Sequence, residues 1–187
     1  MNIYLFRRLL KMKKIVKLAE GYLPTIAAVV ATACFQAGQV YAGDTIDGQS
    51  LNLPSVDIAG KINPTGPAGI SYYQVYAVGS SNAGWEYLKD LQTATTQDHG
   101  GSRITVVTFQ YGYGQASGGT LNAAAGTHEK VSVCGPSAAL YYCGTGDKIT
   151  GYLDYYSFDG AQNGYFTGSA SSSIPPLGTW TDSVYIQ

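Results

Sequence analysis

The sequence predicts a mostly β protein, either an antiparallel β-sandwich or an open barrel, with at most one short helix. Short stretches in which β-branched and aromatic residues alternate recur along residues 70–187, with turn-forming residues between them. The strand–helix alternation that a parallel sheet requires is absent from the pattern. The composition agrees, because 24 glycines and 16 tyrosines accompany only 12% charged residues.

Residues 1–42 are predicted to be a signal peptide. Six Lys and Arg residues form a basic leader, an apolar run follows over residues 23–35, and Val40-Tyr41-Ala42 supplies a cleavage site before Gly43. The apolar run is shorter than the roughly 20 residues that span a bilayer, which disfavours a membrane anchor. Lipidation at Cys34 is the lesser alternative. The mature protein is therefore expected to be secreted, into the medium or into a periplasm.

Removal of this leader leaves an acidic chain. From Gly43 onward, five Lys and Arg residues stand against eleven Asp and Glu, which gives a formal net charge of −6. Without a basic patch, we expect binding neither to nucleic acid nor to an anionic membrane surface. No motif requires a cofactor.

Residues 43–69 are predicted to be an extended or flexible N-terminal arm, and residues 70–187 a single β-rich domain. The arm contains Pro54, Pro64 and Pro67 and no aromatic residue. Its short apolar stretches are suited to pairing with a sheet edge, where proline is tolerated. The first strand of the domain covers residues 70–78. Residues 83–92 fit either one or two helical turns or a strand.

The strand over residues 103–113 is expected to lie in the centre of the sheet. Ile104 and Val106 share one face, and Val107 and Phe109 share the other. Apolar side chains on both faces indicate that layers pack on both sides of this strand.

The remaining chain is predicted to form further strands. These cover residues 128–133, 148–158, 165–167 and 179–187, and residues 139–142 form a short strand or a helical turn. The Asp159-Gly160 and Asn163-Gly164 pairs indicate a hairpin turn. Residues 115–127 and 169–173 are rich in small and polar side chains and are predicted to be loops.

Cys134 and Cys143 remain after processing and are predicted to form a disulfide. An even number of cysteines in an exported chain favours this pairing. The loop they close is short, and loop entropy predicts a stabilisation of roughly 2–3 kcal/mol. The alternative is a catalytic thiol.

Asp98-His99-Gly100-Gly101, just before the central strand, is a weak candidate for catalysis. Such a run resembles a loop whose backbone N–H groups stabilise an oxyanion, with His99 as a base and Asp98 as its partner. No G-x-S-x-G elbow accompanies it, so a simple turn is the preferred interpretation. The only other histidine, His128, completes no zinc motif, and we expect both histidines to face solvent.

Asp154, Asp159 and Asn163 are weak candidates for a calcium site. They cluster around the Gly160 turn and offer oxygen ligands, although their spacing does not match an EF-hand. Asp154 and Asp159 as the acid and base of a glycosidase are a more remote option, because nothing fixes their separation.

Tyrosines dominate the strand over residues 148–158. Tyr152 and Tyr156 lie on one face and Tyr155 lies on the other, so we expect at least two of the three to be partly exposed. Exposed aromatic rings on a rigid sheet provide binding area at a low entropy cost. We therefore predict that Tyr152, Tyr155 and Tyr156 form a binding surface.

Five short motifs, taken together, resemble the YolA-like family of small exported bacterial proteins. They are QVYAVGS (residues 74–80), DHGGS (98–102), YGYG (111–114), VCG (133–135) and TDSVYIQ (181–187). The resemblance covers residues 70–187. It implies export and a common fold, and it supplies no catalytic residues, because the family has no established activity.

A non-enzymatic binding module is the favoured function. Its expected partner is a cell-surface or extracellular polymer or protein. One alternative is a secreted hydrolase centred on His99. The other is a secreted antibacterial factor, which is compatible with either chemistry.

Overall fold

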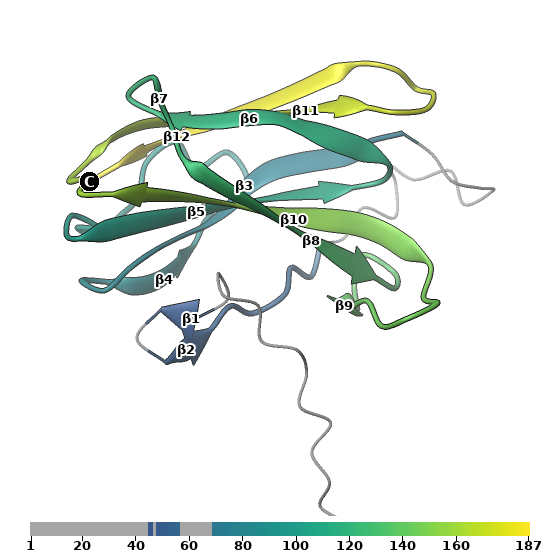
Figure 1. Cartoon of the computed structure of the whole chain (residues 1–187), viewed down its shortest axis with the longest axis horizontal. Coiled ribbons are helices and arrows are strands. Elements are labelled where there is room, and N and C mark those ends of the chain that lie inside the picture. Colours follow the sequence, from purple (N-terminus) through teal and green to yellow (C-terminus); the bar gives the residue numbers. More distant parts are fainter. Residues whose placement is uncertain (1–44, 47, 57–68) are drawn as a thin grey trace, which may run out of the picture. The chain divides into compact units, whose positions relative to one another are not determined.

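The computed structural model describes residues 45–46, 48–56 and 69–187, and every regular element in these ranges is a β-strand (Figure 1). The mostly β fold class is therefore confirmed, and the described residues contain no helix. The predicted signal peptide, Cys34 and much of the N-terminal arm lie outside the described residues.

The larger sheet has six antiparallel strands in the order β4-β3-β5-β10-β8-β9. Its strands are β3 (Tyr72–Ser80), β4 (Gly84–Tyr87), β5 (Arg103–Tyr111), β8 (Thr127–Cys134), β9 (Tyr141–Tyr142) and β10 (Ile149–Asp159). Residues 83–92, for which the sequence allowed helical turns or a strand, thus contribute strand β4, because the backbone of β4 pairs with the end of β3.

The smaller sheet has four antiparallel strands in the order β12-β11-β6-β7. Its strands are β6 (Gly114–Leu121), β7 (Ala124–Ala125), β11 (Gly164–Ser172) and β12 (Thr179–Ile186). A separate hairpin pairs β1 (Thr45–Ile46) with β2 (Gln49–Ser50). The four-stranded sheet stacks on one face of the six-stranded sheet, and the β1–β2 hairpin lies on the other side (Figure 1).

β5 is the central strand that its sequence predicts. It pairs with β3 on one side and with β10 on the other, and seven successive residues from Ile104 to Gln110 are buried. Val106 belongs to an apolar cluster with Phe166 and Val184 of the smaller sheet. Val107, on the opposite face, belongs to a second cluster with Leu51 and Trp85. The six-stranded sheet is therefore covered on both faces.

The described part of the N-terminal arm forms the second cover. Leu51 is buried against this sheet. The carbonyl of Gln49 accepts a hydrogen bond from the indole of Trp85 at 3.0 Å. Asn52 bonds with its backbone to the hydroxyls of both Tyr76 and Tyr87, at 2.9 Å each. Residues 48–56 consequently pack over the face of the sheet.

The smaller sheet contains the main departure from the predicted elements. Residues 114–121 form strand β6 although a loop was expected for residues 115–127, and β11 continues to Ser172 through the second expected loop. Few β-branched residues mark these stretches, so their local sequence does not favour a strand. The strand forms because its backbone pairs with β11 and because glycine allows close packing. A Cβ atom on Gly119 would lie 2.5 Å from the ring of Tyr156.

The predicted disulfide is present. Cys134 and Cys143 are bonded, with 5.2 Å between their Cα atoms. The bond links the end of β8 to the residue that follows β9, so it fixes the last strand of the six-stranded sheet. Neither sulfur is available as a catalytic thiol in this form.

Candidate functional site

His99 is fully buried, so the expectation that it faces solvent is wrong. Its Nδ1 lies 3.3 Å from Oγ of Ser80, and its Nε2 lies 3.2 Å from Oε2 of Glu86. Asp98 is not its partner. The side chain of Asp98 accepts a hydrogen bond from the N–H of Gly100 at 2.9 Å, as the turn interpretation predicts. The two partners of His99 come from the β3–β4 hairpin, which the local motif does not reveal.

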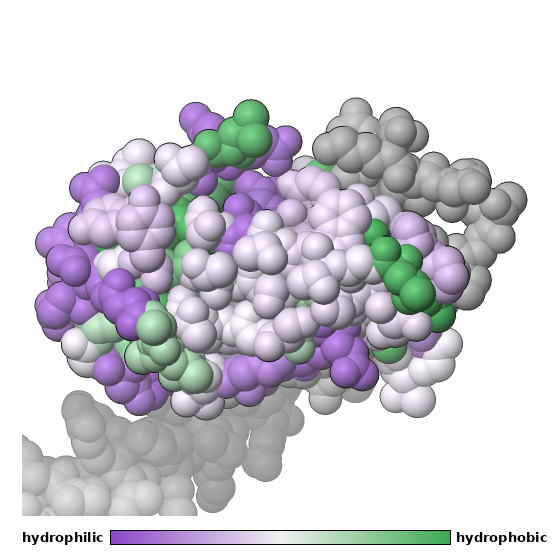
Figure 2. Space-filling view, turned by 90° about the horizontal axis from the view of Figure 1, so that it is seen from above, coloured by the Kyte–Doolittle hydropathy of each residue, from purple (hydrophilic) through white to green (hydrophobic). Residues whose placement is uncertain are grey.

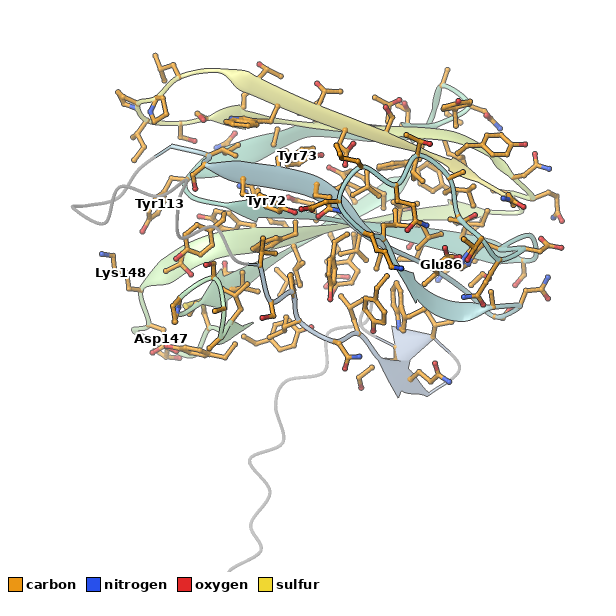
Figure 3. All side chains as sticks on the ribbon, turned by 180° about the vertical axis from the view of Figure 1, so that it is seen from behind. Tyr72, Tyr73, Glu86, Tyr113, Asp147 and Lys148 are labelled. Carbon is orange, nitrogen blue, oxygen red and sulfur yellow. A yellow bond between two sulfur atoms is a disulfide. The ribbon has the colours of Figure 1, made fainter. Side chains whose placement is uncertain are left out.

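Glu86 is the centre of this buried cluster (Figure 3). Its carboxylate accepts hydrogen bonds from the backbone N–H groups of Thr96 at 2.8 Å and Gln97 at 3.0 Å, and from the side chain of Gln92 at 3.1 Å. Burial raises the pKa of Glu86, but the hydrogen bonds from Thr96, His99 and Gln97 outweigh this effect and lower the pKa below its usual value. The cluster therefore holds an ionised carboxylate.

Ser80, His99 and Glu86 are the residue types of a Ser–His–acid triad, yet their burial closes them to a substrate. The N–H of His99 also donates to the carbonyl of Gln187 at 2.7 Å. The cluster thus joins the β3–β4 hairpin, the segment before β5 and the last residue of the chain. We assign it a structural role.

His128 instead forms a pair with Asp154 near an opening between the sheets. Its Nε2 lies 2.8 Å from Oδ1 of Asp154. The side chain of His128 is 40% exposed, whereas that of Asp154 is 0% exposed. The strand register explains the contact. His128 lies opposite Tyr156, its ring stacks on that tyrosine with 4.9 Å between centroids, and Asp154 is its diagonal neighbour.

A pocket of about 440 Å³ opens beside this pair. Residues 116–120 of β6 form one wall, and Ala125, Gly126, His128 and Tyr156 complete the lining. The pair and the pocket therefore bring together residues from both sheets. No sequence motif marks them, because the pairing of β8 with β10 creates the contact between His128 and Asp154.

Asp154 has few hydrogen-bond partners for a buried carboxylate. Its Oδ2 and the hydroxyls of Tyr73, Thr108 and Tyr156 find no hydrogen-bond partner among the described residues. Burial raises the pKa of Asp154, and the hydrogen bond from His128 and the charge of Lys130 offset this only in part. Tyr73 extends from β3 between the two sheets (Figure 3). Such buried groups require an explanation, of which a functional role is one.

Burial also raises the pKa of the Tyr73 and Tyr156 phenols. The neighbouring Thr108 hydroxyl lowers both pKa values, but it offsets the effect of burial only in part. Both phenols therefore stay protonated at neutral pH.

The structure does not bring the three calcium candidates together. Asp154 faces the space between the sheets, whereas Asp159 points away and pairs with Arg103 at 2.6 Å. Asn163 lies in the turn beyond β10, and its carbonyl accepts a hydrogen bond from Asn122. Successive odd and even residues of a strand point to opposite faces, which separates Asp154 from Asp159. Among the residues that the structure describes, no group of three or more His, Cys, Asp or Glu is arranged to hold a metal ion.

The expected exposure of the β10 tyrosines is wrong. Tyr155 and Tyr156 are each only 1% exposed, because the sheet has a cover on both faces. Tyr152 is partly buried, and Nζ of Lys130 lies 3.7 Å from the centroid of its ring. A binding surface built from Tyr152, Tyr155 and Tyr156 is therefore not formed.

Exposed tyrosines occur on the smaller sheet instead. Tyr165 of β11 is 64% exposed and Tyr185 of β12 is 37% exposed. The two residues are register partners, and their ring centroids are 5.3 Å apart. They lie on the side of the sheet that faces away from the core, because the alternate residues Phe166 and Val184 are buried.

The rest of this outer face is rich in hydroxyl groups. Oγ of Ser171 lies 3.0 Å from Oγ of Ser117 and 3.1 Å from Oγ1 of Thr179, so a chain of hydroxyls crosses three strands. The only charged residue in β6, β11 and β12 is Asp182, whose carboxylate faces inward and accepts a hydrogen bond from the N–H of Val75. Figure 2 views this face, which is pale and close to neutral in hydropathy. We call it the outer face, and it comprises Gln115, Ser117, Thr120, Tyr165, Thr167, Ser169, Ser171, Thr179, Thr181, Ser183 and Tyr185.

Comparison with known families yields one match. The model of a domain of unknown function, DUF4879, matches residues 66–186. The chain belongs to the DUF4879 family. The match spans β3 to β12, and thus both sheets, the buried Glu86 cluster and the His128 pocket. No curated protein and no solved structure matches the chain significantly.

Two features of the described residues bear on where the protein is located. Over the described residues, no helix has the length and apolar character needed to cross a bilayer. The Cys134–Cys143 disulfide fits an oxidising compartment.

Proposed function

We propose that this DUF4879 protein is an exported binding module whose outer face binds a neutral extracellular or cell-surface polysaccharide. The observation that carries the proposal is the pair of exposed, mutually contacting rings of Tyr165 and Tyr185 on an uncharged sheet face. Aromatic rings held on a rigid sheet bind the apolar side of a ligand with little loss of conformational entropy.

The hydroxyl groups supply the complementary polar contacts. Ser117, Ser171 and Thr179 lie in one row across β6, β11 and β12. Serine and threonine hydroxyls both donate and accept hydrogen bonds, as sugar hydroxyls do. The absence of charged side chains from the outer face disfavours a strongly charged polymer.

Export supports the choice of ligand. The predicted signal peptide and the disulfide both favour an oxidising compartment outside the cytoplasm, where such polymers occur. The likeness to the YolA-like family supports the same location. An antibacterial role is compatible with binding to a cell-surface polymer. The full burial of His99 argues against a hydrolase centred on this residue.

Removal of either exposed ring should weaken binding. We expect Tyr165→Ala and Tyr185→Ala each to reduce retention on an insoluble neutral polysaccharide at least about fivefold, because aromatic anchors commonly contribute more than about 1 kcal/mol. Sedimentation assays with cellulose, chitin and insoluble glucans measure this. The free energy of unfolding should stay within about 0.5 kcal/mol, because both rings are at the surface.

Tyr141→Ala provides the matched control. Tyr141 is also an exposed tyrosine but belongs to β9 of the other sheet, so its loss should leave retention unchanged. Equal retention of wild type, Tyr165→Ala and Tyr185→Ala, or retention of none of them on any polymer, would refute the proposal.

A further inference from the structure

The pocket beside His128 is a second feature that the outer face does not explain. Its wall from β6 includes Ser117, Gly118 and Thr120, so it lies at the border of the outer face. Strand β7 pairs only with Thr120 and Leu121. Residues 115–118 of β6 therefore have no strand partner on this side among the described residues, and their edge borders the pocket.

His128 contributes a polar ring to the lining of this pocket. Its Nε2 atom lies 2.8 Å from Oδ1 of Asp154, so this nitrogen is already paired. The other ring nitrogen, Nδ1, donates or accepts a hydrogen bond according to the tautomer. Stacking on Tyr156 fixes the plane of the ring. Asp154 is fully buried, so it orients His128 without itself reaching a ligand.

The other walls are small and uncharged. Gly118, Gly119 and Gly126 contribute backbone without side chains, and Ser117 and Thr120 contribute hydroxyl groups. The lining contains no carboxylate and no Lys or Arg. A ligand that matches these walls is compact, neutral and rich in hydroxyl groups, because charged groups would find no partner of opposite sign.

We propose that this pocket is a binding site for a single neutral sugar residue, one hydroxyl of which forms a hydrogen bond with Nδ1 of His128. The size of the pocket, about 440 Å³, is within the range of small-molecule sites. The proposal takes its ligand class from the proposed polysaccharide binding, but it rests on different residues. A site at the border of the outer face can hold a sugar unit at the end of a chain or on a branch.

Nitrogen-15 spectroscopy of labelled histidine tests the site directly. The protein contains two histidines, and buried His99 serves as the internal control. Titration with methyl β-glucoside, methyl α-mannoside and methyl β-N-acetylglucosaminide should shift the Nδ1 resonance of His128 with at least one sugar, while His99 does not move. Saturation is expected at a dissociation constant on the order of 1 mM.

His128→Ala should weaken the same sugar at least tenfold, measured by the backbone amide shifts of Gly118 and Gly126. Glu129→Gln is the matched control, because Glu129 is the next residue of β8 and is exposed. The His99 resonances report whether each variant is folded. If His128→Ala does not fold, His128→Gln takes its place in the measurement.

Further measurements separate sugar binding in the pocket from polysaccharide binding on the outer face and from peptide binding at the edge of β6. The Tyr165→Ala, Tyr185→Ala double variant should keep the His128 shift even where it loses polymer retention, so the two proposals fail independently. An N-acetyl-alanine methylamide probe represents an extended peptide at the open edge of β6. No sugar-induced shift of His128, unchanged affinity in His128→Ala, or a response to the peptide probe alone would overturn the proposal.

Discussion

At the scale of single residues, the two histidines show how the surroundings decide the role of a side chain. His99 is buried between Ser80 and Glu86, whereas His128 is part exposed beside a pocket. Each has a carboxylate partner, and the two carboxylates differ as well. Glu86 accepts several hydrogen bonds and has a lowered pKa, whereas Asp154 accepts one and has a raised pKa. Buried polar groups with a full set of hydrogen bonds stabilise a fold, and buried polar groups that lack hydrogen-bond partners mark candidate sites.

Loss of the Glu86 charge should destabilise the protein in a pH-dependent way. At pH 7, Glu86→Gln should lower the free energy of unfolding by roughly 1.5–3 kcal/mol, the usual range for hydrogen bonds to a charged group. Because the folded-state pKa is lowered, this stability is fully present above about pH 4.3, the ordinary pKa of glutamate, and is lost as the pH falls through the folded-state value.

Urea unfolding at pH 7 and near pH 3 measures this difference. The gap between wild type and Glu86→Gln should narrow at the lower pH. An equal gap at both pH values would show that the carboxylate charge contributes nothing. Glu129→Gln, at an exposed position of β8, serves as the control and should change stability little at either pH.

At the scale of elements, β6 shows how a strand forms without strand-forming residues. It carries glycine at positions 114, 118 and 119, and two of these contact large buried side chains closely. Gly114 lies against Ile70, and Gly119 lies against Tyr156. Glycine allows the smaller sheet to approach the larger one at these points. The same approach forms a wall of the His128 pocket.

Gly119→Ala should therefore destabilise the protein although alanine favours ordered backbone more than glycine does. Its Cβ atom would lie 2.5 Å from the ring of Tyr156, which is buried and packs against His128 and Phe166. We expect a loss of roughly 1–3 kcal/mol, the usual effect of overpacking. Thermal or urea unfolding measures it.

Gly178→Ala is the matched control, because no atom lies within 4 Å of the added Cβ. It should leave stability within about 0.5 kcal/mol of wild type. A Gly119→Ala variant as stable as Gly178→Ala would mean that the two sheets adjust freely at this contact.

At the scale of the whole molecule, the six-stranded sheet is covered on both faces. The smaller sheet covers one face, and residues 48–56 lie against the other. This arrangement explains why Tyr155 and Tyr156, on opposite faces of β10, are both buried. The exposed aromatic pair lies on the smaller sheet, whose outer face has no cover among the described residues.

The N-terminal segment should accordingly contribute to stability. Leu51→Ala is expected to lower the free energy of unfolding by about 2–5 kcal/mol, because Leu51 is buried in the cluster that contains Trp85 and Val107. Leu177→Ala is the control, since Leu177 is 73% exposed. Chemical denaturation compares the two. Equal stability of both variants would show that the segment is not part of the folded core.

Features that depend on a local pattern could be predicted from the amino-acid sequence. Alternating β-branched and aromatic residues predicted β5, β10 and β12. Apolar side chains on both faces of β5 predicted that this strand is central. Two cysteines in a predicted export context indicated their bond. These signals are local because strand geometry repeats every two residues and a disulfide requires only two nearby thiols.

Which surfaces remain exposed and which side chains come into contact depend on how the strands and layers assemble. Glu86 and His99 are joined by the path of the chain after β4, and His128 meets Asp154 through the register of β8 against β10. The covers on the six-stranded sheet buried the tyrosines of β10 and left Tyr165 and Tyr185 exposed. Strand pairing and layer stacking join residues distant in sequence, and no local pattern encodes which partner a strand or a face will find.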